Sequence, residues 1–119
     1  MSILLATTRP EALTGFTEAL ARATGRDVAV TASGAETLAA LPVRAPKLVV
    51  IDENLPDNDP LALVREIMMV SAMTLTAVVT DMPEDEFHEA AEGYGILMPL
   101  PPNPGDQDAR ELATRLSAL

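Results

Sequence analysis

Residues 48–61 read LVVIDENLPDNDPL, and this stretch decides the fold class. Its first four residues are apolar and mostly β-branched, which predicts a strand buried on both faces of a sheet. Residues 52–58 are rich in Asp, Asn and Pro and predict a turn. Asp59 followed by Pro60 predicts a helix start, because Asp is a good amino-terminal cap and Pro suits the first helical position. The stretch therefore predicts one strand–loop–helix unit.

The same unit recurs along the chain. Short apolar runs predict strands over residues 3–6, 28–30, 76–80 and 96–98, and helices are expected from 10, from 33 to before Pro42, over 83–92 and over 106–119. Five such units predict one α/β domain over residues 1–119, a doubly wound (βα)5, flavodoxin-like domain with a five-stranded parallel sheet. Ligands bind such sheets where the strands end, so the loops at 6–10, 52–59, 80–83 and 98–104 are the candidate site.

The composition of the 119 residues excludes several classes of function. The chain has no cysteine, which rules out disulfides and thiolate metal sites and suits a reducing cytoplasm. Its formal net charge of −10 disfavours binding to nucleic acids and to anionic membranes. No segment has the pattern of a signal peptide or the length of a membrane span. We therefore expect a cytoplasmic protein whose partners are other proteins.

Residues 48–61 also resemble the phospho-acceptor region of response-regulator receiver domains, the CheY-like family. In that family an aspartate ends the third strand and is followed by x-x-(Leu/Met)-Pro and a short turn into a helix. The order and spacing of the strands extend the resemblance over the whole chain. It implies that Asp52 is at the phospho-acceptor position and that Asn54 is the residue whose backbone carbonyl binds the metal. It also implies that Thr80 is the switch hydroxyl and that Pro99 is the proline after the family's lysine, where the peptide bond is often cis.

The chain departs from the family pattern at the residues that carry the chemistry. Thr7 and Thr8 stand where receivers have two acidic residues that hold Mg²⁺, and Met98 stands where they have the lysine. Mg²⁺ prefers oxygen ligands that include carboxylates, and phosphoryl transfer needs its negative charge neutralised. We therefore expect no enzymatic activity, no cofactor and at most weak Mg²⁺ binding, with Asp52 and Asn54 as weak candidate ligands. Replacement ligands are less favoured, and they would be Glu53, Asp57, Asp59 and Asp81. The simplest alternative for Asp52 is a solvated aspartate at a strand end.

Two surfaces are candidates for protein contacts. Met68, Met69 and Met73 cluster where the third helix ends, and methionine adapts easily to different partners. The resemblance supplies the second surface, because receivers use helix four, strand five and helix five for output and dimerisation. Phe87, Tyr94 and Ile96 lie on or near it, which leaves a homodimer open.

Our leading hypothesis is a stand-alone pseudo-receiver in two-component (phosphorelay) signal transduction, which acts by phosphorylation-independent protein–protein interaction. The alternative is a single-domain response regulator that accepts phosphate on Asp52 from a histidine kinase. A flavodoxin-type binder of a small molecule is the third hypothesis, and a chain with only three aromatic residues offers a flavin few stacking partners.

Overall fold

The computed structural model describes residues 2–119. Its strands are β1 (Ile3–Ala6), β2 (Val28–Thr31), β3 (Leu48–Ile51), β4 (Leu75–Val79) and β5 (Met98–Leu100). Its helices are a 3₁₀ turn η1 (Pro10–Leu13) and α1 (Thr14–Thr24), α2 (Gly34–Arg44), α3 (Pro60–Val70), α4 (Glu84–Ala90) and α5 (Asp106–Ser117). The strands form one parallel sheet in the order β2-β1-β3-β4-β5, so the predicted doubly wound (βα)5 fold is confirmed.

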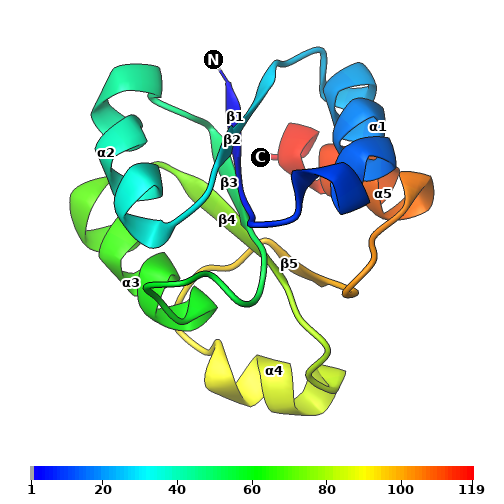
Figure 1. Cartoon of the computed structure of the whole chain (residues 1–119). Coiled ribbons are helices and arrows are strands. Elements are labelled where there is room, and N and C mark those ends of the chain that lie inside the picture. The colour runs from blue at the N-terminus through cyan, green and yellow to red at the C-terminus, as the bar shows by residue number, and fades with distance from the viewer. Residues whose placement is uncertain (1) are drawn as a thin grey trace.

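The sheet divides the apolar core into two layers. In Figure 1, α1 and α5 lie together on one side of the sheet, and α2 and α3 lie on the other. Alternate residues of each central strand enter opposite layers: Val50 packs with the α1–α5 layer, and Val49 and Ile51 pack with the α2–α3 layer. All four residues of β1 and of β3 are buried, as their unbroken apolar runs predict.

The predicted cap of α3 is confirmed, and α2 is also capped by a side chain. The Asp59 carboxylate accepts hydrogen bonds from the backbone N–H groups of Leu61 and Ala62, and Pro60 opens α3. The Ser33 hydroxyl accepts one from the Glu36 N–H and caps α2. These caps fix where α2 and α3 begin after the loops that follow β2 and β3.

The prediction that α2 stops before Pro42 is wrong. The helix continues to Arg44, and the Ala45 N–H donates to the Leu41 carbonyl at 2.9 Å. A proline removes only its own N–H, so the bonds made by the residues after it close the last turn.

The last strand is also displaced from its predicted position. Strand β5 covers Met98–Leu100 instead of residues 96–98, and β4 covers Leu75–Val79 instead of residues 76–80. Helix α4 ends at Ala90, before Gly93 and Gly95, which have φ of 87° and 63°. These left-handed turns keep residues 94–96 out of the ladder, although their apolar side chains resemble a strand. Met98 therefore begins the strand, which ends at Leu100.

Candidate functional site at the carboxyl end of the sheet

Asp52 follows β3 directly and is completely buried, with an exposed fraction of 0%. Its backbone N–H donates to the Ala6 carbonyl at 2.9 Å, which fixes the residue beside β1. The alternative of a solvated strand-end aspartate is therefore wrong. A buried carboxylate is costly unless hydrogen bonds and an opposite charge compensate it, so its partners decide what the site can do.

The carboxylate of Asp52 accepts four hydrogen bonds, two at each oxygen. Oδ2 accepts from the Thr7 hydroxyl at 2.7 Å and from Arg9 Nε at 2.8 Å. Oδ1 accepts from the Glu53 N–H at 2.9 Å and from Arg9 Nη2 at 3.0 Å. A carboxylate offers about four lone-pair positions, so these donors use its whole capacity.

Arg9 supplies the positive charge of the site. Its guanidinium meets Asp52 through two parallel N–H···O bonds, the arrangement that makes an arginine–carboxylate pair both strong and geometrically specific. The pKa of Arg9 lies above its ordinary value, chiefly because of the hydrogen bond to Asp52 and against the opposing effect of burial. An arginine of the chain itself therefore supplies the positive charge opposite the buried aspartate.

The same guanidinium connects three loops. Arg9 follows β1 and binds Asp52 at the end of β3, and its Nη1 donates to the Asn103 side chain at 3.1 Å. Its Nη2 also donates to the Pro102 carbonyl in the loop after β5. Three loops that are distant in the sequence are thus held together by one side chain whose exposed fraction is 31%.

The two threonines at the family's acidic positions have different environments. Thr7 is buried, donates to Asp52 and accepts a hydrogen bond from the Arg9 N–H at 3.0 Å. Thr8 is exposed and makes no side-chain hydrogen bond within residues 2–119. Only Thr7 belongs to the immediate surroundings of Asp52.

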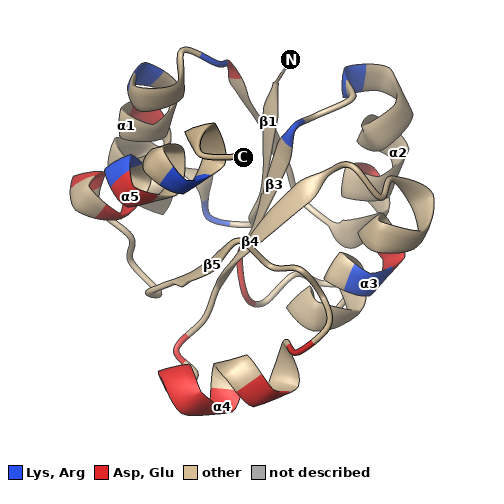
Figure 2. Cartoon of the chain, turned by 180° about the vertical axis from the view of Figure 1, so that it is seen from behind, with Lys and Arg blue, Asp and Glu red and all other residues tan. Residues whose placement is uncertain are grey.

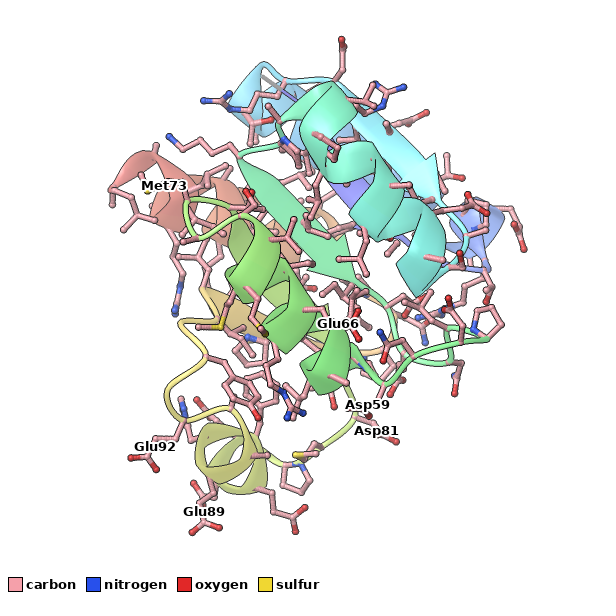
Figure 3. All side chains as sticks on the ribbon, turned by 90° about the vertical axis from the view of Figure 1, so that its left-hand side faces the viewer. Asp59, Glu66, Met73, Asp81, Glu89 and Glu92 are labelled. Atoms are coloured by element: carbon pink, nitrogen blue, oxygen red, sulfur yellow. The ribbon has the colours of Figure 1, made fainter. Side chains whose placement is uncertain are left out.

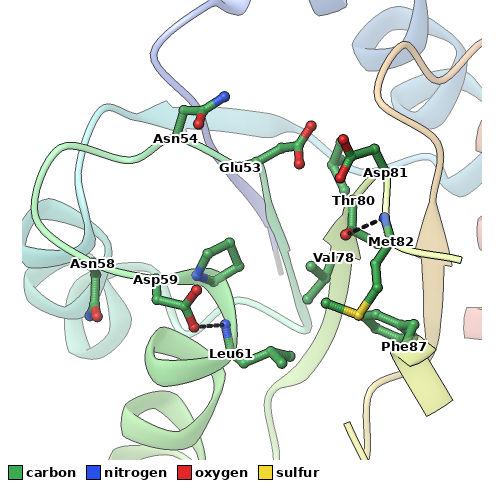
Figure 4. A pocket seen from close by; sticks show the side chains of 12 residues that line it. Glu53, Asn54, Asn58, Asp59, Leu61, Val78, Thr80, Asp81, Met82 and Phe87 are labelled. Atoms are coloured by element: carbon green, nitrogen blue, oxygen red, sulfur yellow. Dashed lines mark hydrogen bonds between the residues drawn. The ribbon is translucent and has the colours of Figure 1, made fainter. Parts of the chain in front are cut away.

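A separate cavity of about 400 Å³ opens beside this site, between the loops after β3 and β4 (Figure 4). Asn54, which has φ of 64°, and Thr80 both line it. The Thr80 hydroxyl accepts from the Met82 N–H at 3.1 Å, so it is engaged within its own loop. Asp52 itself does not line the cavity.

Met98 and Pro99 do not occupy the end of the last strand. The Leu100 carbonyl accepts from the Thr80 N–H at 2.9 Å, and Pro101 follows it, so Leu100 is the residue next to Thr80 at the strand end. Met98 is the first residue of β5 and not its last, so the prediction that it stands at the strand end is wrong. Leu100, like Met98, carries no charge. Met98, Pro99 and Thr80 are among the residues that line a second cavity, of about 540 Å³. No peptide bond is cis in the part of the chain that the structure describes.

The residues at Asp52 do not fit a divalent metal in this arrangement. Both carboxylate oxygens are hydrogen-bonded to a guanidinium, and a cation cannot share them without displacing it. Within residues 2–119 no group of three or more His, Cys, Asp or Glu side chains is placed to hold a metal ion.

Arg9 is the site residue that the sequence analysis missed. Among the loops at the carboxyl ends of strands 1, 3, 4 and 5, residues 6–10, 52–59, 80–83 and 98–104, it is the only basic residue. A search of those loops for a replacement cation would have identified it.

The two predicted contact surfaces differ in exposure. Phe87 has an exposed fraction of only 3% and packs in the α2–α3 core layer, so it cannot serve as an exposed contact residue. Tyr94 and Ile96 are half-buried against that layer. Met69 and Met73 are 83% and 90% exposed, and Met68 is 39% exposed. Of these six residues, Met69 and Met73 are the most accessible.

The described residues contain no helix that is long and apolar enough to cross a membrane. The sequence matches no protein-family model and no curated protein.

Solved structures resemble the fold closely. A two-component response regulator from Legionella pneumophila is 19% identical with a TM-score of 0.79, and the match covers 100% of this chain and 99% of that one. The receiver domain of NtrX from Brucella abortus is 21% identical with a TM-score of 0.82, and the match covers 97% of each chain. A chemotaxis response regulator from Vibrio cholerae is 19% identical with a TM-score of 0.79, covering 98% of each chain. The chain therefore has the fold of response-regulator receiver domains.

Proposed function

We propose that this chain is a pseudo-receiver of two-component signalling, which acts through protein–protein contacts without accepting a phosphoryl group. The observation that carries the proposal is the pairing of Arg9 with Asp52. The proposed partner is a histidine kinase or another signalling protein in the cytoplasm, and the chain itself has no enzymatic role.

The chemistry of phosphoryl transfer supports this proposal. A carboxylate that attacks phosphorus needs an accessible oxygen, whereas each oxygen of Asp52 already accepts two hydrogen bonds. Catalysis of the transfer depends on cations that neutralise the incoming phosphoryl oxygens. The one guanidinium at this site is already committed to the aspartate that would be the nucleophile.

The electrostatics support a second part of the proposal, that the protein is fixed in one conformation. In receivers that respond to phosphate, as the family resemblance implies, a change at the aspartate shifts a population between two states. A ligand or modification can shift such a population only if it interacts differently with the two states. Thr7 and Arg9 already donate to Asp52, and Arg9 also donates to Asn103, so a phosphoryl group would have to displace these contacts to make that difference.

The test is an amide NMR titration of the whole chain with Mg²⁺, followed by beryllofluoride as a phosphoryl mimic. We expect no saturable shifts at Glu53, Asn54 or Thr80. A receiver domain with the acidic pair and the lysine, titrated in the same buffer, shows that the mimic has formed.

The control variant is Asp52→Asn, which keeps the shape of the side chain. Saturable shifts in the natural chain that disappear in this variant would overturn the proposal and establish the alternative, a phosphorylatable regulator. Sedimentation of the same samples would show whether the chain forms a homodimer.

A further inference from the structure

Exposed apolar side chains gather where α2 and α3 end, at the edge of the sheet opposite Asp52. Val43 is 82% exposed, Met69 83%, Val70 65% and Met73 90%. We call these four residues the amino-edge patch. Figure 3 shows Met73 on the turn after α3, well apart from the labelled carboxylates of Asp59 and Asp81. The core does not need these side chains, since the buried residues of α3 are Leu63, Val64 and Ile67.

Hydrogen bonds hold the loops after the two helices side by side. The Thr74 hydroxyl donates to the Pro46 carbonyl at 3.3 Å, and the Leu75 N–H donates to the Lys47 carbonyl at 2.9 Å. Between the loops lies a hollow of about 350 Å³ lined by Ala45, Pro46, Lys47, Ser71, Met73 and Thr74. Met73 and Lys47 thus border one hollow, so a partner that binds there contacts an apolar side chain and a cation together.

The two segments that carry the amino-edge patch are opposite in charge to the protein as a whole. Residues 37–51 and 67–80 contain no Asp or Glu, although the chain carries a net charge of −10. Their two charged residues are Arg44 and Lys47, and neither forms a salt bridge within residues 2–119. Figure 2 shows acidic residues concentrated along α4 instead.

Because salt screens electrostatic interactions, the charges close to the amino-edge patch act most strongly on a partner that binds there. The Debye length is about 8 Å at physiological ionic strength, whereas the molecule measures 34 × 29 × 29 Å. A partner at the amino-edge patch therefore experiences Arg44 and Lys47 more strongly than the distant acidic residues of α4.

We propose that the amino-edge patch binds an acidic amphipathic helix of a partner protein. The apolar face of that helix packs on Met69, Val70 and Met73, whose flexible methionines adapt to an incoming surface. Carboxylates beside that face meet Arg44 and Lys47. This contact lies away from Asp52, so it stands or fails independently of whether the chain accepts phosphate.

The test uses two designed peptides that form the same amphipathic helix, one with Glu and the other with Lys beside its leucine face. Each is titrated into the labelled full-length chain and followed by amide NMR. The acidic peptide is expected to give saturable shifts at Lys47, Val70, Met73 and Thr74, and the basic peptide none. Reversing both charges, with Arg44→Glu and Lys47→Glu, is expected to weaken binding about tenfold or more, and Met73→Gln weakens it too.

The matched control is Val30→Gln, which changes an exposed apolar residue (46% exposed) on the edge strand β2 and leaves the affinity unchanged. Equal binding of the two peptides, or shifts centred elsewhere, would overturn the proposal. Two further results would also overturn it. One is binding to phosphatidylserine vesicles in preference to the acidic peptide. The other is a homodimer that Met73→Gln dissociates.

Discussion

The two edges of the sheet differ in how far their candidate binding groups are buried and hydrogen-bonded within the chain. At the carboxyl edge, Asp52 is charged and fully buried, and Arg9, Thr7 and Glu53 satisfy its hydrogen bonds within the chain. At the amino edge, Met69 and Met73 are exposed to solvent. A carboxylate whose hydrogen bonds are all made within the chain has no free position for a ligand, whereas burying an exposed apolar surface against a partner is favourable in free energy. Under the proposed function, the carboxyl edge is closed by the chain's own residues and the amino edge is the surface that binds a partner.

The variant expected to change the free energy of unfolding most is Arg9→Met. The substitution leaves the Asp52 carboxylate buried without a cation, and breaking such pairs costs about 3–5 kcal/mol. Because Arg9 is 31% exposed and water can partly replace it, we expect a loss near the lower end of that range. Urea unfolding measures the free energy of unfolding.

The double variant Arg9→Met with Asp52→Asn is the control for that experiment. Removing both charges should recover much of the lost stability, because the cost comes from the unpaired carboxylate. A loss below about 1 kcal/mol in the single variant, as for a surface pair, would show that the carboxylate does not depend on Arg9.

A smaller effect is expected for Thr7→Val, which keeps the shape of the side chain and removes both a donor to Asp52 and the acceptor of the Arg9 N–H. Losing one partner of a buried acceptor costs about 1–3 kcal/mol. Thr8→Val is the matched comparison, because Thr8 is exposed, and its free energy of unfolding should change little. Equal losses in the two variants would contradict the separate placement of these threonines.

Asp57, at the carboxyl edge, is expected to make the free energy of unfolding depend on pH under acid conditions. The backbone N–H groups of Gly34 and Ala35 donate to its carboxylate at 2.8 and 3.0 Å, and they lower its pKa below the usual 3.8. A carboxyl whose folded pKa is lowered adds stability above its unfolded pKa and loses it as the pH falls through the folded value. Unfolding of Asp57→Asn should therefore depend less steeply on pH below 3.8 than unfolding of the natural chain. Parallel curves for the two would remove Asp57 from this role.

The smallest effect is expected at the other edge, for Met73→Gln. The side chain is 90% exposed and buries almost nothing on folding, so the free energy of unfolding should stay within about ±0.5 kcal/mol. Thermal unfolding followed by circular dichroism checks this. A clear loss of stability would mean that Met73 serves the fold instead of a partner, and the contrast between the edges would weaken.

The elements that were predicted well are those whose local sequence and environment agree. Strands β1 and β3 have unbroken apolar runs and lie in the middle of the sheet, so pattern and burial coincide. Strand β5 lies at the sheet edge and contains Pro99. Of the apolar residues before it, Tyr94 and Ile96 pack against the α2–α3 layer and Leu97 packs against the α1–α5 layer, and none of them joins the ladder. The limits of β5 depend on two left-handed glycines and on pairing with β4, which periodicity does not reveal.

The site was only partly predictable for a similar reason. Asp52 was located by its place after a buried strand and by the residues that follow it. Arg9 was missed because its pairing depends on the conformation of the loop after β1 and on a side chain that reaches across to the end of β3. The missing acidic pair and lysine indicate which residues of the family pattern this chain lacks. They do not indicate which residue of this chain supplies the positive charge instead.

The three-loop connection made by Arg9 also has a kinetic consequence. Its bonds join residues separated by 43 positions for Asp52 and by 94 positions for Asn103. Such distant groups meet only after most of the parallel sheet has formed, because the entropy of closing long loops has to be overcome first. The guanidinium contacts should therefore be largely absent from the folding transition state. Arg9 then acts mainly on the rate at which the folded protein opens, so that its removal shortens the lifetime of the native state while the chain still folds at nearly its original speed.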